Sequence, residues 1–582
     1  MKKYKDDIIS IILSIILVIF IWHNFLVSGN NVIFIFIFVA CYIALKKILS
    51  KLNKRSGIVA AIIAILFALV EVICKSINTD YTLNHIINKW LIVNLSGYFI
   101  IAWAVILCMF DIFENNKLNN KQIKIFGKEI FTSNTLSVII CAVLILIAWT
   151  PYFLRYYPGI VTSDSYSQIE QTIGKIDLQD HHPITHTAII GIFINLGLLI
   201  FKNINTGIAL YSLASMVIMA ILDSLVLRYL SKKKVPAPVR IIILLYYMFY
   251  PINATYSVTM WKDVIFSGLV PIFLILCMEL IFNTDEFFSK KRNVVIYIIV
   301  ALFTILLRHN GLYAVILTLP FILIVLRKHW KKVLPLFIGV VVAYELSNIL
   351  IFNILKISKV SVGEMLSIPL QQIARVEKYH KEELDENTIT QINNFFVVEN
   401  IGEQYTPTLS DNVKFKFNTE YFNENKSELI NLWLKLLIKY PKDYVESFIS
   451  NSYGYYYPEA FNTAVIRVTL DHDMGIEQSP KIEGKLVDKL NDLTETRGIP
   501  VFSMIFSIGA GFWLTIICLG YKIYKKEYRY ILVYLPTLIL WLTCVASPAF
   551  CEFRYAYPIF TTLPIFISMN FINKENNEKS EN

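Results

Sequence analysis

Long apolar runs alternate with short polar segments along most of the chain. A helix needs about 20 consecutive apolar residues to cross a bilayer, and several of the runs approach or reach that length. Only helices and closed barrels satisfy every backbone group inside a bilayer, so the pattern predicts a polytopic, all-α membrane protein. The runs lie near 8–27, 31–46, 57–75, 90–113, 135–154, 187–201, 207–230, 238–258, 264–283, 293–307, 312–326, 333–355, 500–521, 530–546 and 556–572.

The polar segment 155–188 lies between two of these runs and carries an unusual set of side chains. Asp164 stands at a predicted helix start, where Ser163 or Asp164 itself can cap the helix. Apolar residues follow from Tyr166 at spacings of 3, 4 and 3 residues, which predicts a short amphipathic helix on the bilayer surface. Glu170 is a second acid on this helix. A simple cap at Asp164 and a solvated Glu170 are the plain alternatives to a catalytic role.

Three histidines stand near the end of this segment: His181, His182 and His186. Their spacing does not match a zinc motif, and no Cys or acid cluster completes a metal site. Pro183 suits a first helical turn, so we expect the histidines at a helix N-terminus, which attracts anions such as phosphate. We expect neither a metal nor a cofactor. Three acids could hold a divalent cation only by converging in the fold: Asp164, Glu170 and Asp263.

The basic residues set the expected orientation. The net charge is +10, but Lys and Arg lie in short clusters between apolar runs, as the positive-inside rule requires of cytoplasmic loops. No nucleic-acid recognition motif accompanies the charge, so we expect no nucleic-acid partner. The N-terminal MKKYKDD precedes the first apolar run without a small-residue cleavage site. We therefore expect a retained first helix and a cytoplasmic N-terminus in the plasma membrane.

One assumption brings every later basic cluster into agreement with the rule. If 187–201 crosses fully, these clusters all fall outside; if it does not, they all fall inside. We therefore predict that 187–201 is membrane-parallel or re-entrant, or that 187–230 contains a single crossing, which leaves about 14 spans. The C-terminus is then cytoplasmic, and 155–188 and 357–499 are extracellular.

Four regions follow from this order. Residues 1–134 form an N-terminal four-helix membrane module, and 135–356 form a catalytic membrane core whose first outer loop is 155–188. Residues 357–499 form an extracellular, mainly α-helical domain, because this stretch is long, polar and amphipathic and has no apolar run of membrane length. Residues 500–582 supply the C-terminal membrane helices.

The same orientation places further polar and aromatic side chains outside, most of them at span ends. Lys262 could merely snorkel to the headgroups, and Arg554 could merely pair with Glu552. Arg308 is harder to explain, because an Arg at an external helix end goes against the positive-inside trend. The outer side chains that we expect near a substrate are Trp261, Lys262, Asp263, Arg308, His309, Asn310, Arg554 and Tyr555, together with Gln371 and Gln372, which could also only cap helices.

These residues together suit one reaction. The cations Lys262, Arg308 and Arg554, with His181 and His182, are expected to bind a phosphate. Asp164 is suited to act as a general base. An acid, a phosphate clamp and aromatic walls at a membrane surface are what sugar transfer from a lipid-phosphate donor needs. Glu170 and Asp263 are the second acids. The expected substrate-binding residues are Tyr166, Trp261, His309, Asn310, Gln371, Gln372 and Tyr555.

Several motifs resemble those of the GT-C superfamily of membrane glycosyltransferases: TSDSYSQIEQ, HHPITHT and RYAYP. The order of PGIVTSDSYSQ, HHPITHT, WKDVIFS, LRHNGLY, LSIPLQQIAR and FRYAYP more closely resembles a Gram-positive membrane family of the DUF6020 type, over roughly 151–558. The superfamily resemblance implies a GT-C-like helical bundle with Asp164 in the place of the catalytic acid. A His pair stands where relatives often have Lys-Pro-Pro, so the phosphate-binding role is spread over His182, Lys262, Arg308 and Arg554.

Three functions remain open. The first is an inverting transferase that moves a sugar from a polyprenyl-phosphate donor to a cell-surface glycan, lipid or polymer acceptor. The second is a transporter or flippase of lipid-linked sugars. Transporters place polar residues near the bilayer midplane, often in inverted repeats, whereas these candidates lie at span ends and no repeat is found. The third is a non-catalytic envelope scaffold, which a wide separation of Asp164 from Arg554, with no cavity between them, would favour.

Overall fold

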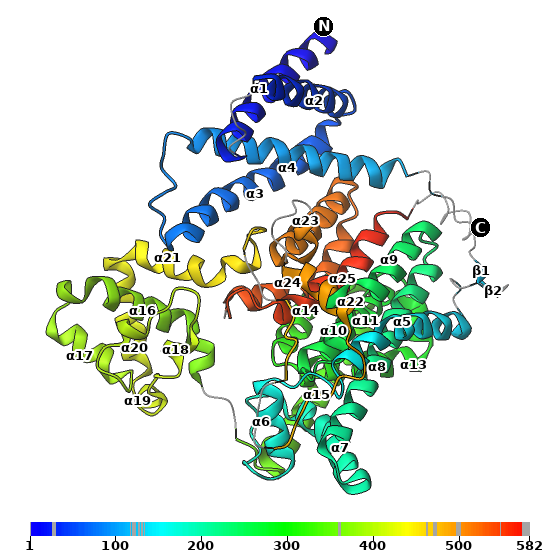
Figure 1. Cartoon of the computed structure of the whole chain (residues 1–582), viewed down its shortest axis with the longest axis vertical. Coiled ribbons are helices and arrows are strands. Elements are labelled where there is room, and N and C mark those ends of the chain that lie inside the picture. Colours follow the sequence, from blue (N-terminus) through cyan, green and yellow to red (C-terminus); the bar gives the residue numbers. More distant parts are fainter. Residues whose placement is uncertain are drawn as a thin grey trace.

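The computed structural model of the chain is helical along nearly its whole length (Figure 1). It describes every residue except 1, 26–30, 117, 119–123, 126–127, 130–131, 133, 359–361, 461–463, 470–473, 496–501, 547–548 and 573–582. The all-α prediction is confirmed, with one short antiparallel pairing of β1 (Lys124–Ile125) and β2 (Lys128–Glu129) in addition. The C-terminal tail, whose predicted place is the cytoplasm, lies outside the described residues.

The N-terminal helices form a group at the top of Figure 1. Helices α3 (Lys54–Asp80) and α4 (Leu91–Glu114) pack against each other and are joined by a short loop, 81–90. Asn53 caps α3 by accepting a hydrogen bond from the backbone N–H of Arg55. The same helix also packs against the C-terminal membrane helices, which attaches the group to the rest of the molecule. The four helices are α1 (Lys2–Phe25), α2 (Asn31–Ser50), α3 (Lys54–Asp80) and α4 (Leu91–Glu114).

The remaining membrane helices surround α11 (Lys262–Phe282), which is buried on all sides rather than along one stripe. Its 21 residues span about 30 Å, the thickness of bilayer hydrocarbon, so its two ends mark the two faces of the membrane region. The other helices of this core are α5 (Thr135–Arg155), α8 (Ile204–Lys232), α9 (Ala237–Phe249), α10 (Pro251–Ser257), α12 (Thr284–Ser289), α13 (Lys291–Leu307), α14 (Asn310–Val325), α15 (Trp330–Asn348), α23 (Ile508–Tyr524), α24 (Ile531–Ala546) and α25 (Phe553–Met569).

Among the described residues, 10 helices are long and apolar enough to cross a membrane, and the pair α9 and α10, bent by 51°, would make 11. The chain is thus a multi-pass membrane protein by length and composition, and the number of about 14 spans stays a prediction. Four core helices of 16 or 17 residues, at the lower limit of the crossing length, are not among the 10: α13, α14, α23 and α25.

Helix α7 (Ile184–Phe201) is one of the 10 candidates by length and composition, but its contacts show where its two ends lie. Its first turn contacts α8 through His186 and Tyr211, and its last turns approach the start of α8, where Gly197 and Gly207 meet without room for a Cβ. Helix α8 then runs alongside α11 to the other end, where Lys232 and Lys233 pair with Glu279. Both ends of α7 therefore lie near one end of α11, and these contacts favour a single crossing within 187–230.

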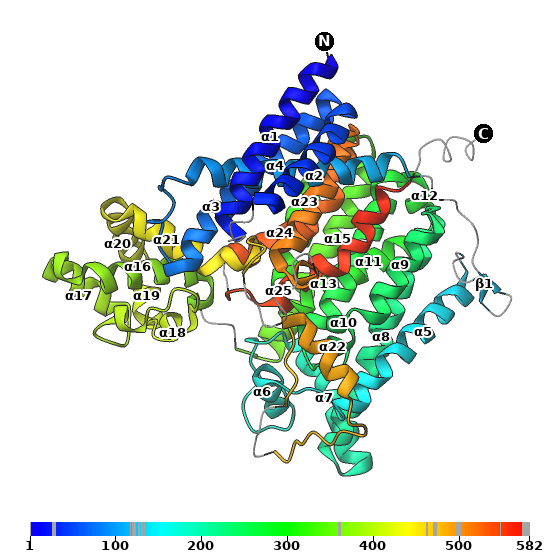
Figure 2. The same ribbon diagram turned by 45° about the horizontal axis from the view of Figure 1, so that its top comes forward.

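The stretch 357–499 divides between two apolar clusters. Its larger part has a core of its own, which lies to the left in Figures 1 and 2. Tyr453, Tyr455 and Tyr457 and the last helix of the stretch instead pack with the membrane core. The helices of the stretch are α16 (Ser367–His380), α17 (Glu386–Asn394), α18 (Asp411–Lys414), α19 (Thr419–Glu424), α20 (Lys426–Lys439), α21 (Pro441–Ser452) and α22 (Lys485–Glu495).

Short helical turns connect many of these elements. The turn between α14 and α15 consists of three basic residues, Arg327–His329, and the turn before α24 carries Arg529. The 3-10 turns are η1 (Arg327–His329), η3 (Val362–Leu366), η4 (Lys381–Glu383), η5 (Ile401–Gln404), η6 (Tyr453–Tyr455), η7 (Ser503–Phe506) and η8 (Tyr528–Tyr530), and η2 (Ile349–Ile354) is a π-helical continuation of α15.

Candidate active site

The loop that begins with Ile160 is attached to the segment that precedes α11. The backbone N–H of Ile160 donates to Val258 O over 2.9 Å, and the N–H of Met260 donates to Ile160 O over 3.0 Å. The indole N–H of Trp261 donates to Thr162 Oγ1 over 2.7 Å, and the hydroxyl of Ser165 donates to Met260 O. These bonds fix the start of α6 (Ser163–Thr172) beside the start of α11.

Asp164 lies in the first turn of α6 and meets two cations from distant parts of the chain. Its Oδ2 accepts from Lys262 Nζ over 3.2 Å and from Arg554 over 2.8 Å. The side chains of Asp164, Lys262 and Arg554 are 20%, 12% and 15% exposed, so the group is largely shielded from water. Three of the residues that the sequence singled out separately therefore form one cluster, which we call the Asp164 group.

His182 completes this group as a neutral side chain. Its Nδ1 lies 3.1 Å from Lys262 Nζ, which is a donor, so Nδ1 must act as the acceptor. Burial, followed by the positive charge of Lys262, lowers the pKa of His182 to about 3. The 4.0 Å approach of Nδ1 to Asp164 Oδ2 is therefore not an ion pair at neutral pH. The neutral tautomer leaves the proton on Nε2 as a donor.

The cations also control the ionisation of Asp164. Burial alone would raise the pKa of its carboxyl group. Lys262 and Arg554, and then His182, outweigh burial and hold the pKa of Asp164 well below its usual range. Asp164 is therefore an anion at every physiological pH, and its basicity is suppressed while both cations remain in contact with it.

A second ion pair lies behind the Asp164 group. Arg308 pairs with Asp263, which is fully buried in the first turn of α11, and the other oxygen of this carboxylate has no hydrogen-bond partner among the described residues. The guanidinium of Arg308 lies 4.3 Å from the centre of the Tyr555 ring. Arg308 is thus held by one acid and one aromatic face rather than by the headgroups.

Two aromatic side chains contact Arg554, and one of them, Tyr555, also contacts Arg308 and so connects the two ion pairs. The guanidinium of Arg554 lies 5.0 Å from the ring centre of Trp261 and 4.8 Å from that of Tyr555. Arg554 also donates to the Tyr555 hydroxyl over 3.2 Å, and its Nε lies 3.5 Å from Glu552. The expected Glu552–Arg554 pair exists, but the shorter contact of Arg554 is with Asp164.

Several other predicted residues surround this region without joining the Asp164 group. His309 Nε2 approaches Asp180 O at 3.1 Å, and Asn310 donates to Thr543 over 3.0 Å. His181 is exposed beside His182, and Glu170 is partly buried on α6. Their roles in binding remain predictions.

The remaining predicted substrate-binding residues have contacts of a structural kind. Tyr166 is 3% exposed and lies in an apolar cluster. Gln372 donates to Tyr444 O and accepts from Trp433, and Gln371 donates to Thr406 O. These contacts are not with the Asp164 group, and the role of the three residues in substrate binding stays a prediction.

Sequence reasoning missed the polar residues that position the loop. The Nδ1–H of His186 donates to Gln168 Oε1 over 3.0 Å, so His186 Nε2 accepts from the Tyr211 hydroxyl over 2.8 Å. Thr162 and Ser165 hold the loop to 260–261, as described above. The only signal for them was the density of small polar residues in TSDSYSQ, which alone does not distinguish supports from ligands.

A metal ion has no evident site in the described part of the chain, where no three His, Cys, Asp or Glu side chains are placed to hold one. Asp164 and Asp263 already pair with the cations Lys262 and Arg308. The prediction that the protein uses no metal and no cofactor stays a prediction.

Most residues of this site lie in a region that matches a known protein family. A model of the DUF6020 family, described as a family of unknown function, matches residues 173–582. The chain belongs to the DUF6020 family. The matched region contains His182, Lys262, Arg308 and Arg554 but begins after Asp164. No curated protein and no solved structure matches the chain. The cations and aromatic residues of the site therefore lie within the region that matches the DUF6020 model, whereas Asp164 lies in the segment before it.

Proposed function

We propose that this member of the DUF6020 family is an inverting GT-C-type glycosyltransferase of the plasma membrane. It would transfer a sugar from a polyprenyl-phosphate donor to a cell-surface glycan, lipid or polymer acceptor. The observation that carries the proposal is the contact of one shielded carboxylate, Asp164, with Lys262 and Arg554 at the end of a membrane-length helix. An acid and a pair of phosphate-binding cations at the membrane boundary are what the reaction requires.

The reaction would proceed by direct displacement. The acceptor hydroxyl attacks the anomeric carbon, and its proton passes to the carboxylate of Asp164. The bond from the anomeric carbon to the phosphate oxygen breaks, and its electron pair leaves with the polyprenyl phosphate. Lys262 and Arg554 stabilise the charge on this leaving group, with the Nε2–H of His182 as a neutral donor.

The free protein keeps this base in a resting state, because the cations that would bind the phosphate are bound to Asp164. An anionic donor would compete for Lys262 and Arg554 and draw them away from Asp164 Oδ2. Loss of these partners raises the proton affinity of the carboxylate. Donor binding would in this way activate the base in the complex that needs it.

The proposed orientation places the Asp164 group and the stretch 357–499 outside the cell, with both termini in the cytoplasm. It rests on the distribution of Lys and Arg, which are clustered in the loops at the other end of α11. The lipid carrier would remain in the outer leaflet while its phosphate reaches the Asp164 group.

The first test replaces the carboxylate in protein that is normally inserted. Asp164→Asn removes the base with little change of shape, so sugar transfer from a panel of polyprenyl-phosphate hexoses should fall roughly 100-fold to 10,000-fold. Asp177→Asn, at an exposed acid of the same loop, is the matched control and should retain transfer within a few-fold. Unimpaired transfer by Asp164→Asn would sink the assignment of the base.

One observation also favours the scaffold alternative, since Asp164 and Asp263 are both compensated, as in a structural ion-pair network. The 2.8 Å contact of Asp164 with Arg554 removes the wide separation that the scaffold predicted. Absence of sugar transfer by the unaltered protein from every polyprenyl-phosphate hexose, with Asp164→Asn lowering only thermal stability, would favour the scaffold.

A further inference from the structure

A cavity of about 530 Å³ lies at the end of α11 opposite to Lys262. It is formed by α12, which follows the last turn of α11, and by α13 and α15. Since α11 is about as long as the bilayer hydrocarbon is thick, this cavity and the Asp164 group lie at opposite faces of the membrane region. The cavity is therefore independent of the site described above.

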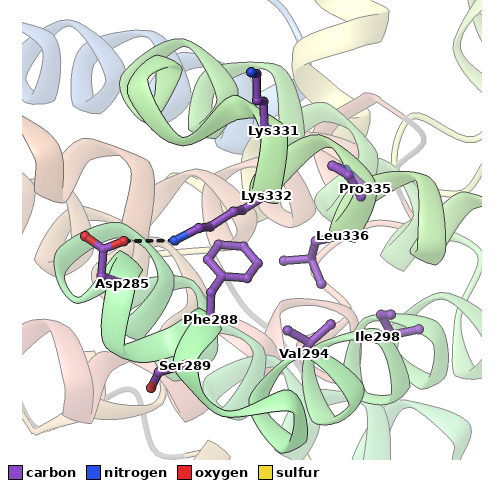
Figure 3. A pocket seen from close by; sticks show the side chains of 9 residues that line it. All are labelled: Asp285, Phe288, Ser289, Val294, Ile298, Lys331, Lys332, Pro335 and Leu336. Atoms are coloured by element: carbon purple, nitrogen blue, oxygen red, sulfur yellow. Dashed lines mark hydrogen bonds and ion pairs between the residues drawn. The ribbon is translucent and has the colours of Figure 1, made fainter.

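The lining of this cavity is apolar below and charged at its rim. Figure 3 shows Phe288, Val294, Ile298 and Leu336 around one apolar space. Lys332 reaches past Phe288 to Asp285, which accepts its hydrogen bond over 3.1 Å. Lys331 projects from the rim in the same view. A ligand with an apolar part and an anionic end matches this division.

A second, more polar cavity of about 400 Å³ adjoins the first, because Asp285 lines both. Asp285 is the only acid of the two linings, and its contacts are with Lys332 and His329. Four other cations line the two cavities: Arg327, Lys328, Lys331 and Arg529. Among the described residues, none of these four cations has a carboxylate or other polar partner. The rim thus carries a marked excess of positive charge.

The apolar floor continues onto surfaces that face outward from the bundle. Val295 and Ile299 of α13 are 53% and 48% exposed, and Ile338 of α15 is 52% exposed. In a membrane these side chains contact acyl chains, so a lipid in the cavity could keep its chains on the apolar floor and its headgroup at the basic rim.

We propose that this cavity binds the headgroup of an anionic phospholipid, whose phosphate lies among the rim cations and whose first acyl carbons lie on Phe288, Val294 and Leu336. Charge complementarity selects an anion, and the apolar floor open to the bilayer selects a lipid over a soluble phosphate. In the orientation proposed above, the lipid belongs to the cytoplasmic leaflet.

The test measures lipid retention by the full-length protein. Purified protein is equilibrated with equal amounts of phosphatidylglycerol and phosphatidylcholine, and bound lipid is counted by native mass spectrometry. The unaltered protein should retain phosphatidylglycerol preferentially. Lys331→Ala/Lys332→Ala should reduce that preference by roughly tenfold, since each Lys near a headgroup contributes to the attraction.

The matched control is Lys291→Ala/Arg292→Ala, which removes two exposed cations of the same membrane end that do not line the cavity. It should leave the preference nearly unchanged, and an equal loss in both double variants would mean diffuse attraction and overturn the proposal. Val294→Trp, which fills the cavity without changing charge, should also abolish retention. Retention by this variant, displacement by millimolar inorganic phosphate, or no preference in the unaltered protein would each contradict a lipid site.

Discussion

At the scale of single residues, one oxygen atom, Asp164 Oδ2, is the common partner of Lys262 and Arg554. Arg554 is the more specialised of the two cations. Its planar guanidinium contacts Asp164 and the Tyr555 hydroxyl at once and lies beside the Trp261 ring. An ammonium group is a point charge on a flexible stem and cannot reproduce this set of contacts.

Arg554→Lys should therefore lower kcat/KM for sugar transfer by tenfold or more, roughly the value of one lost charge-assisted hydrogen bond. Steady-state kinetics over a range of donor concentrations measures this. Arg292→Lys, an exposed residue at the other end of the membrane region, makes the same chemical change and should alter kcat/KM by less than about twofold. Equal kinetics for both variants would argue against a donor-binding role for Arg554.

His182 makes the folded protein sensitive to acid. Its pKa is about 3 in the fold and near 6.5 in an unfolded chain, so between these values the unfolded state binds the extra proton. Stability therefore falls as the pH falls below about 6.5, by about 2 kcal/mol at pH 5. The lowered pKa of Asp164 acts in the same direction, but only below about pH 4.

His182→Gln should consequently show a smaller decrease in Tm between pH 7.5 and pH 5 than the unaltered protein. The measurement is thermal unfolding of the detergent-solubilised protein at both pH values. His181→Gln removes the exposed neighbour and should leave the decrease as it is. A decrease that His182→Gln does not change would mean that His182 is protonated in the fold.

The sequence predicted which residues belong to the site, but not that Asp164 contacts Lys262 and Arg554 in the fold. Asp164, Lys262 and Arg554 each stood out in the sequence as an ionisable group near a span end. Their contacts join positions 98 and 390 residues apart, and no local pattern encodes such a pairing. Tyr166 shows what a local pattern does encode: its place in an amphipathic stripe predicted the helix and also accounts for its burial.

At the scale of elements, the hydrophobic runs of the sequence located the long apolar helices, while the number of about 14 membrane spans stays a prediction. A run of apolar residues shows that a helix is buried or faces lipid, but both environments give the same signal. Helix α13 ends at Leu307, the backbone of Arg308 is extended, and α14 begins two residues after Arg308. The separate runs 293–307 and 312–326 predicted this break, but not that it brings Arg308 to Asp263.

Helix α7 gives the clearest topological prediction. Since both of its ends lie near one end of α11, His181→Cys and Lys202→Cys should react alike with a membrane-impermeant maleimide on intact cells. Lys233→Cys, at the far end of α8, should behave in the opposite way. The unaltered protein, with its own free thiols, supplies the background. Different labelling of positions 181 and 202 would show that α7 crosses the membrane.

At the scale of the whole molecule, a buried ion network joins the stretch 357–499 to the N-terminal helices. Glu446 pairs with Arg375 and also accepts a hydrogen bond from the backbone N–H of Leu83, in the loop between α3 and α4. Arg375 and Glu446 are 3% and 4% exposed, so neither can be compensated by water. The family-matched region is thus anchored partly on helices that precede it.

Glu446→Ala should destabilise the protein by about 3 kcal/mol, because it leaves Arg375 buried with one partner fewer. Thermal unfolding and limited proteolysis at the 81–90 loop both report the change. Glu424→Ala, an exposed acid of the same stretch, should leave both measurements unchanged. If the two variants melt alike, the network does not join the two parts.

The shared oxygen of Asp164 has a consequence for turnover. A phosphate that leaves a sugar carries more negative charge than the donor did, so Lys262 and Arg554 would bind the product more tightly than the substrate. After proton transfer, however, Asp164 is neutral, and it becomes an anion again once it loses that proton to solvent. The recovered charge competes with the lipid phosphate for the same two cations. On the proposed function, the base would therefore also help to expel the spent carrier, and deprotonation would set the pace at which the enzyme becomes free again.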